Sequence, residues 1–157
     1  MAGDELTVKV EHLGEMLRDV KAFDAKLATY VRREIRNSAK TAVVDVQATV
    51  RSGPGRTGGG KLRESIARGV RVQISTGKRT NGVRIVSTGA GLSADHKPMV
   101  KAYNKATFRH PVFGRNTWAD QPGRAYFGNV IARRSEDVRR GILRALDMAS
   151  QALAHRY

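Results

Sequence analysis

Hydrophobic residues recur along the chain with two different periods, and the two periods predict its main elements. Apolar and polar residues alternate over residues 6–10, 70–74 and 83–85, which is the pattern of half-buried strands. Apolar residues spaced by three and four extend from Phe23 to Val50 and again from Ile131 to Leu153. This second period predicts two amphipathic helices, one over residues 21–52 and one at about 130–154 within the closing segment 127–157.

The first of these helices is predicted to be long. No proline or glycine interrupts residues 15–52, and the run Ser52-Gly53-Pro54-Gly55 then ends the helix. At 1.5 Å per residue it would be about 45 Å long, which exceeds the needs of a compact domain of this size. Such a helix either projects from the body or packs against a partner.

Shorter elements are expected in the middle of the chain, residues 53–126. We predict a short helix over residues 61–67 and a β-hairpin whose turn is favoured by Asn81-Gly82. The pattern over residues 99–106 fits either a helix or a strand. Residues 110–127 combine aromatic residues with prolines and glycines and suggest no regular element.

These elements together predict an α+β fold. Long N-terminal and C-terminal amphipathic helices would pack on one face of a small antiparallel sheet. With no internal repeat and no linker, we expect one domain over residues 1–157, with residues 1–20 as an N-terminal arm that contains the first strand.

The chain is strongly basic. Its 157 residues include 29 Lys and Arg against 14 Asp and Glu, for a net charge of +15 and a pI near 11.1. Residues 52–126 alone carry 14 basic and 3 acidic side chains. A field of this size attracts polyanions whatever the fold is. Proximity to DNA remains one interpretation beside a merely soluble surface and an acidic protein partner.

Three arginines on the first long helix and four on the last, Arg139 and Arg140 among them, form candidate polyanion-facing clusters, with two further basic residues at the hairpin tip. A solvated helix face is the alternative interpretation of each cluster. In the absence of zinc-finger patterns or base-stacking aromatic strands, any DNA contact would be directed at the backbone. The candidates are Arg32, Arg33, Arg36, Lys78, Arg79, Arg133 and Arg134.

Catalytic chemistry finds little support in the sequence. There is no cysteine, the four histidines are scattered, and the only carboxylates in residues 52–126 are Glu64, Asp95 and Asp120. We therefore expect no enzyme, no cofactor and no metal site.

The segment from Gly55 to Lys61 matches the first seven positions of a phosphate-binding P-loop. The eighth position, which should be Ser or Thr to hold magnesium, is Leu62, and the segment follows a predicted helix instead of a buried strand. We interpret it as a glycine-rich connection.

No stretch of the chain reaches the 18 or so apolar residues of a membrane span. Its first sixteen residues are acidic and lack the pattern of a signal peptide, so we expect a protein made in a reducing cytoplasm, without a membrane partner.

Three segments carry a family resemblance. Residues 51–66 read RSGPGRTGGGKLRESI, residues 110–114 read HPVFG, and residues 121–127 read QPGRAYF, with Trp118 between the last two. In this order, between two long helices, they resemble the neck or tail-completion proteins of long-tailed bacteriophages. The chain departs from that pattern in a loop longer by two glycines and in Ala125, where proline is common.

The resemblance implies a non-enzymatic virion subunit that forms a ring, expected to be sixfold, at the head–tail junction or the top of the tail tube. Its partners would be further copies of itself, connector, tail-terminator or tail-tube proteins, and nearby genome DNA without sequence specificity. The alternative function is a sequence-independent nucleic-acid-binding protein. Residues of the matching segments are candidate subunit contacts, with a plain core cluster as the alternative for the aromatic ones: Thr57, Leu62, Arg63, His110, Phe113, Trp118, Arg124, Tyr126 and Phe127.

Overall fold

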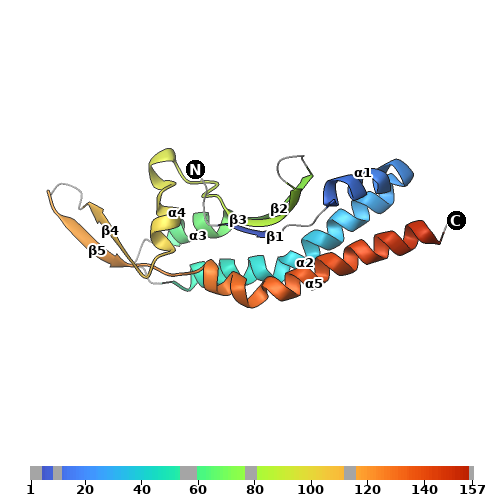
Figure 1. The fold of residues 1–157 in the computed structure, drawn as a ribbon. Helices are drawn as coiled ribbons and strands as arrows, with labels where there is room; N and C mark the ends of the chain where they lie inside the picture. Colours follow the sequence, from blue (N-terminus) through green and yellow to red (C-terminus); the bar gives the residue numbers. More distant parts are fainter. Residues whose placement is uncertain (1–4, 9–11, 54–59, 77–80, 112–115, 156–157) are drawn as a thin grey trace.

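The computed structural model describes residues 5–8, 12–53, 60–76, 81–111 and 116–155. It shows an elongated molecule of helices and two small antiparallel sheets (Figure 1). In chain order the elements are β1 Glu5–Val8, α1 Leu13–Phe23, α2 Ala25–Arg51, α3 Gly60–Arg68, β2 Val70–Thr76, β3 Asn81–Ser87, the 3-10 turn η1 Ala94–His96, α4 Met99–Tyr103, β4 Thr107–Pro111, β5 Trp118–Pro122 and α5 Gly128–Ala154.

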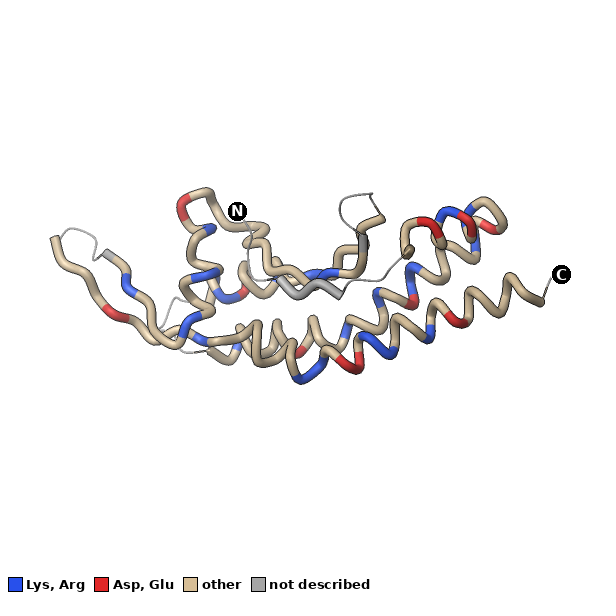
Figure 2. Tube along the Cα trace, in the orientation of Figure 1, with Lys and Arg blue, Asp and Glu red and all other residues tan. Residues whose placement is uncertain are grey.

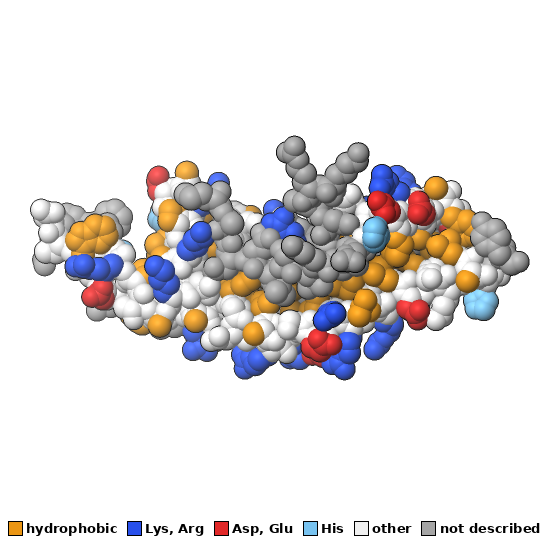
Figure 3. Space-filling view, in the orientation of Figure 1, with side chains coloured by type: hydrophobic (Ala, Val, Ile, Leu, Met, Phe, Trp, Pro, Cys, Tyr) orange, Lys and Arg blue, Asp and Glu red, His pale blue; other side chains and the backbone are white. Residues whose placement is uncertain are grey.

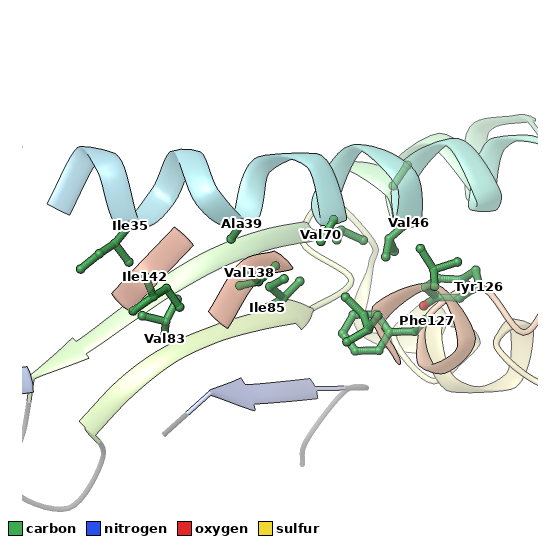
Figure 4. Close-up of a cluster of buried hydrophobic side chains, with 14 of the residues drawn as sticks. Ile35, Ala39, Val46, Val70, Val83, Ile85, Tyr126, Phe127, Val138 and Ile142 are labelled. Carbon is green, nitrogen blue, oxygen red and sulfur yellow. The ribbon is translucent and has the colours of Figure 1, made fainter. Parts of the chain in front are cut away.

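The predicted α+β class is confirmed. Helices α2 and α5 lie side by side and antiparallel, and the three-stranded sheet, in the order β1-β3-β2, covers one face of the pair (Figure 1). Apolar side chains from α2, α5 and β3 meet between the layers, with Ile35, Val138 and Ile85 among them (Figure 4). The long amphipathic stripes of the sequence therefore form the core, as expected.

The hairpin expected from the alternating pattern is present as β2 and β3. Val72 pairs with Ile85 and Ile74 with Val83, so the apolar residues of both strands share the face toward the helices. At one end of the sheet, the side-chain amide of Gln47 donates to the carbonyl of Val70 at 3.3 Å. That hydrogen bond ties the start of β2 to α2.

The prediction of one helix across residues 21–52 was wrong at its beginning. Asp24 is extended, with φ −152° and ψ 111°, and divides the helical stretch into α1 and α2. Its carboxylate accepts hydrogen bonds from the backbone N–H groups of Lys26 at 2.7 Å and Leu27 at 3.2 Å. This side-chain cap begins a new helix where the periodic pattern suggested continuity, and residues 13–20, predicted as part of an arm, belong to α1.

Two segments of the chain form elements that the sequence had left undecided or had not predicted. Residues 99–103 form the helix α4, so the strand alternative for this segment is wrong. Residues 107–122 contribute the strands β4 and β5, which pair with each other as a separate two-stranded ribbon. Figure 1 shows this ribbon extending beyond one end of the helical layer.

The contact between α2 and α5 is unusually close. Alanines 39, 42, 145 and 149 are buried along the two helices, and the backbone of Gly141 lies against the side chain of Ser38. A Cβ atom at position 141 would collide with the Cβ atom of Ser38. Gly141 is therefore required by the approach of the two helices, which small residues permit.

We expect Gly141→Ala to lower the melting temperature. Overpacking at a close contact typically costs about 1–3 kcal/mol, whereas alanine in a helix interior gains only about 1 kcal/mol over glycine. Gly128→Ala in the same helix is the matched control, because a Cβ atom there has nothing within 4 Å and the melting temperature should stay the same or rise. Thermal unfolding followed by circular dichroism measures both. A rise in stability for Gly141→Ala would contradict the close contact.

Candidate functional site

A buried polar junction lies where the ribbon meets the body. Tyr126 is fully buried, and its hydroxyl donates to the carbonyl of Val100 at 3.1 Å. The same hydroxyl lies 3.1 Å from the buried hydroxyl of Ser87, which is placed to donate to it. One side chain thus joins the start of α5 to α4 and to the end of β3.

Asn104 completes this arrangement from the end of α4. Its side-chain oxygen accepts hydrogen bonds from the backbone N–H groups of Tyr126 at 2.9 Å and Phe127 at 3.0 Å. The chain is therefore fixed at the point where it enters α5. We call Ser87, Tyr103, Asn104 and Tyr126 the tyrosine junction.

Tyr103 brings the end of α2 and the helix α3 into the same junction. Gly53 lies so close to the Tyr103 hydroxyl that no larger residue fits there, and the Arg63 guanidinium donates to the carbonyl of Gly53. Burial raises the pKa of the Tyr103 hydroxyl, and the positive charge of Arg63 opposes this shift. Arg63, predicted as a subunit contact, therefore makes its described contacts within its own chain.

Beside the junction, an ion-pair cluster links α2 to α3. Glu64 accepts from Arg51 at 2.8 Å and from Arg68 at 3.1 Å. The hydrogen bond from Arg51 is the largest of the effects that lower the pKa of Glu64 to about 2. The carboxylate of Glu64 therefore partly neutralises the positive charges of Arg51 and Arg68.

The ribbon itself has a sparse set of contacts. Phe108 is buried and packs edge-to-face on Tyr103, with ring centroids 6.5 Å apart. Arg109 and Asp120 face each other across the strands with a 3.7 Å ion pair. Trp118, in contrast, is 60% exposed at the start of β5. The ribbon is held at its base and presents a large aromatic side chain away from the body.

At its base, the ribbon is also joined by backbone hydrogen bonds. The N–H of Gly123 donates to the carbonyl of Ala106 at 2.9 Å, and the N–H of Arg124 donates to that of Tyr103 at 2.7 Å. A Cβ atom at Gly123 would collide with the carbonyl oxygen of Lys105. These contacts set the direction of the ribbon relative to α4.

The residues predicted as subunit contacts differ in how far they are buried. Leu62 packs partly buried against the core, and Tyr126 and Phe127 are buried inside it, so the subunit-contact prediction for the last two is wrong and the core alternative holds. Trp118 and Arg124 are exposed, and His110 is half-buried beside Phe108. Thr57 and Phe113 lie outside the described residues.

The predicted basic side chains of the two long helices are spread along the helix pair. Arg134 pairs with Asp45 at 2.7 Å, which sets the register of the two antiparallel helices. Because Arg36 is nine residues from Asp45 on α2, it lies about 14 Å along the helix from the level of Arg134. The contact of Gly141 with Ser38 places Arg139 and Arg140 nearer the level of Arg36. Lys78 and Arg79 lie outside the described residues.

Their individual environments differ as well. Arg33 stacks over the ring of Tyr30 at 5.1 Å and lies 3.6 Å from Glu34. The hydrogen bond with Asp45 raises the pKa of Arg134. Arg36 and Arg133 are exposed and Arg32 is half-exposed.

The described residues contain no group of three His, Cys, Asp or Glu side chains that could hold a metal ion. Over the same ranges, none of the helices has the length and apolar character needed to cross a bilayer. Comparison with known proteins finds no matching family model, no matching curated protein and no matching solved structure. Among the described residues, the tyrosine junction and the ribbon that it holds are the features that suggest a function most directly.

Removal of the Tyr126 hydroxyl should destabilise the fold. In Tyr126→Phe, the buried Ser87 hydroxyl loses its hydrogen bond to Tyr126, which costs about 1–3 kcal/mol. Urea unfolding should show this loss, while Tyr30→Phe, a hydroxyl deletion at a partly exposed position, should leave stability nearly unchanged. A double variant with Ser87→Ala should recover part of the loss. Equal stability of Tyr126→Phe and wild type would contradict the role of the junction.

The Glu64 cluster should contribute to stability at neutral pH and lose that contribution in acid. Because the folded-state pKa of Glu64 is depressed, its contribution is present in full above about pH 4.5 and is lost as the pH falls through about 2. Glu64→Gln should melt below wild type at pH 7, and most of this difference should be gone at pH 2. Glu136→Gln, on the exposed face of α5, is the control and should show no such convergence. A constant difference at both pH values would contradict the pairing.

Proposed function

We propose that this chain is a structural, non-enzymatic subunit of a bacteriophage virion that assembles into a ring at the head–tail junction or the top of the tail. The observation that supports this most is the convergence of the family-like segments on the tyrosine junction. Arg63 comes from the first segment, Arg124 and Tyr126 come from the last, and all three lie around Tyr103. The shared residues thus serve to hold the ribbon in place.

The ribbon has the properties of an assembly element. An isolated two-stranded hairpin is marginally stable in water, and β4 and β5 have no second layer over most of their length in the described chain. Exposed tryptophan is uncommon on surfaces that remain in water and is enriched at the centres of protein interfaces. Trp118 is therefore our candidate for the anchor of a contact with a neighbouring copy.

The elongated shape is compatible with a ring. A ribbon at one end that contacts a different surface of the next copy makes a head-to-tail interface, and such interfaces close into rings when the rotation permits. We expect a sixfold ring in the neck or tail, stacked on other connector or tail proteins of the virion, with assembly from subunits made in the host cytoplasm. The protein would have no cofactor in this role.

Assembly should depend on Trp118. Truncation of a central interface tryptophan typically costs 2 kcal/mol or more, or about 30-fold in the affinity of each contact. We expect native mass spectrometry and sedimentation to show wild-type oligomers, and Trp118→Ala to shift them toward monomers without a change in melting temperature, because the side chain is exposed.

Leu143→Ala is the matched control for this experiment. Leu143 is also a large exposed apolar side chain, at 53% exposure, but it lies on α5 away from the ribbon and should leave the oligomers intact. A wild-type protein that stays monomeric at every concentration and with candidate tail proteins would rule out the ring. Equal oligomers in wild type and Trp118→Ala would rule out the ribbon as its anchor.

A further inference from the structure

A row of three exposed lysines runs along the segment that contains α4. Lys97, Lys101 and Lys105 are spaced by four residues. Lys97 and Pro98 have right-handed helical backbone angles ahead of α4, and Lys105 follows α4 in a turn whose N–H donates to the carbonyl of Ala102. Lys97 and Lys101 therefore emerge on one side, about 6 Å apart along the axis, and with Lys105 the row is about 12 Å long.

This arrangement is unfavourable for the segment itself. Like charges four residues apart destabilise a helix by about 0.2–0.5 kcal/mol per pair, and the row contains two such pairs. Residues 97–105 contain no acidic residue, and none of the three lysines has an ion-pair partner among the described residues. The repulsion within the row is therefore not offset by an ion pair among the described residues.

Several other basic groups of the structure are paired. Glu64 lies between two arginines at the α2–α3 contact, Asp137 contacts two arginines on α5, and Asp45 holds Arg134. The three lysines of the row have no such partner among the described residues. Figure 2 shows the basic positions along α4, and Figure 3 shows basic side chains at the surface of this end.

The row is also held in a fixed place. Tyr103 and Asn104 lie within the same helical segment and belong to the tyrosine junction. The exposed Arg124 is attached to it by the hydrogen bond from its N–H to the carbonyl of Tyr103. Because the backbone that carries the row is fixed, a ligand that binds there restricts only the lysine side chains.

We propose that Lys97, Lys101 and Lys105, with Arg124 beside them, form a binding surface for the phosphate backbone of duplex nucleic acid. Each strand of a duplex carries one phosphate per 3.4 Å of helix axis, so a row of about 12 Å spans three or four phosphates. Lysine binds phosphate as a flexible point charge, whereas planar recognition of carboxylates favours arginine forks. Tyr103 and Phe108, the aromatic residues nearest the row, are buried, so base stacking on single strands is not favoured here.

This surface does not depend on ring assembly. A monomer would present the same row, and its binding would be independent of sequence, because phosphate contacts carry no base readout. The proposal replaces the arginine clusters of the long helices with a different surface as the principal polyanion contact.

The test is the salt dependence of binding to a mixed-sequence DNA duplex, measured by fluorescence anisotropy with the full chain. Each phosphate contact contributes about 0.9 to the slope of log affinity against log salt concentration. The triple variant Lys97→Gln, Lys101→Gln, Lys105→Gln should lower that slope by up to about 2.7. It should remain folded, with an equal or higher melting temperature, because the repulsion within the row is removed.

The matched control is Lys21→Gln, Lys26→Gln, Lys40→Gln, which removes the same charge from exposed lysines of α1 and α2. Its slope should stay close to that of wild type. Equal slopes for the two triple variants, or no binding of wild type at low salt, would overturn the proposal. Polyglutamate with a chain as long as the duplex serves as an acidic competitor. If it displaces the duplex equally well, and if its own binding is lost in the triple variant of the row, the surface binds an acidic protein and the assignment to nucleic acid is wrong.

Native mass spectrometry of the protein–DNA complexes distinguishes the failure of this proposal from the failure of the proposed ring. If Trp118→Ala binds the duplex as a monomer, and this binding is lost when the three lysines are replaced, the DNA-binding surface is supported even though no oligomer forms. Oligomers that assemble normally without row-dependent binding would leave the proposed function standing and overturn this inference.

Discussion

The buried hydroxyl of Tyr126 is the interaction on which the arrangement of this molecule depends most. It meets a carbonyl 26 residues earlier in the chain and a hydroxyl 39 residues earlier, so it joins α4, β3 and the start of α5 at one point. A buried polar group without a partner is expensive, so these elements must fold together to satisfy it. The direction of the ribbon and the position of the lysine row both follow, because both are attached to α4 and to the segment that precedes α5.

A second constraint acts in the middle of the molecule. The close approach of α5 to Ser38 at Gly141, and the pair between Arg134 and Asp45, fix the register of two long antiparallel helices. These helices form a stiff layer on which the sheet rests. With the register fixed in the middle and the junction fixed at one end, the chain has an extended form, which is compatible with the proposed head-to-tail assembly.

The parts of this structure with a continuous apolar face were predictable from sequence, and the others were not. Helices α2 and α5 and strands β2 and β3 bury one face each, so their periods appear in the sequence. The break between α1 and α2 at Asp24 leaves the apolar stripe intact on both sides, so the hydrophobic periodicity does not reveal it. Among the side chains that the structure describes in β4 and β5, only Phe108 is apolar and buried, so the sequence has no alternating pattern that predicts the ribbon. Ser87 and Asn104 act through partners far away in the chain, which no local pattern encodes.

The distribution of charge along the sequence was the weakest guide to the structure, because a count along the chain does not say which charges remain unpaired after folding. Within residues 52–126, Arg68 pairs with Glu64, whereas Lys101 faces no carboxylate among the described residues. The lysine row and Trp118 are attached to the same junction and extend in different directions from it. In the proposed assembly, a neighbour that covers Trp118 would be held at a fixed position relative to the row. Successive copies would then present their rows at regular intervals, which suits a repeating polyphosphate better than a single acidic partner.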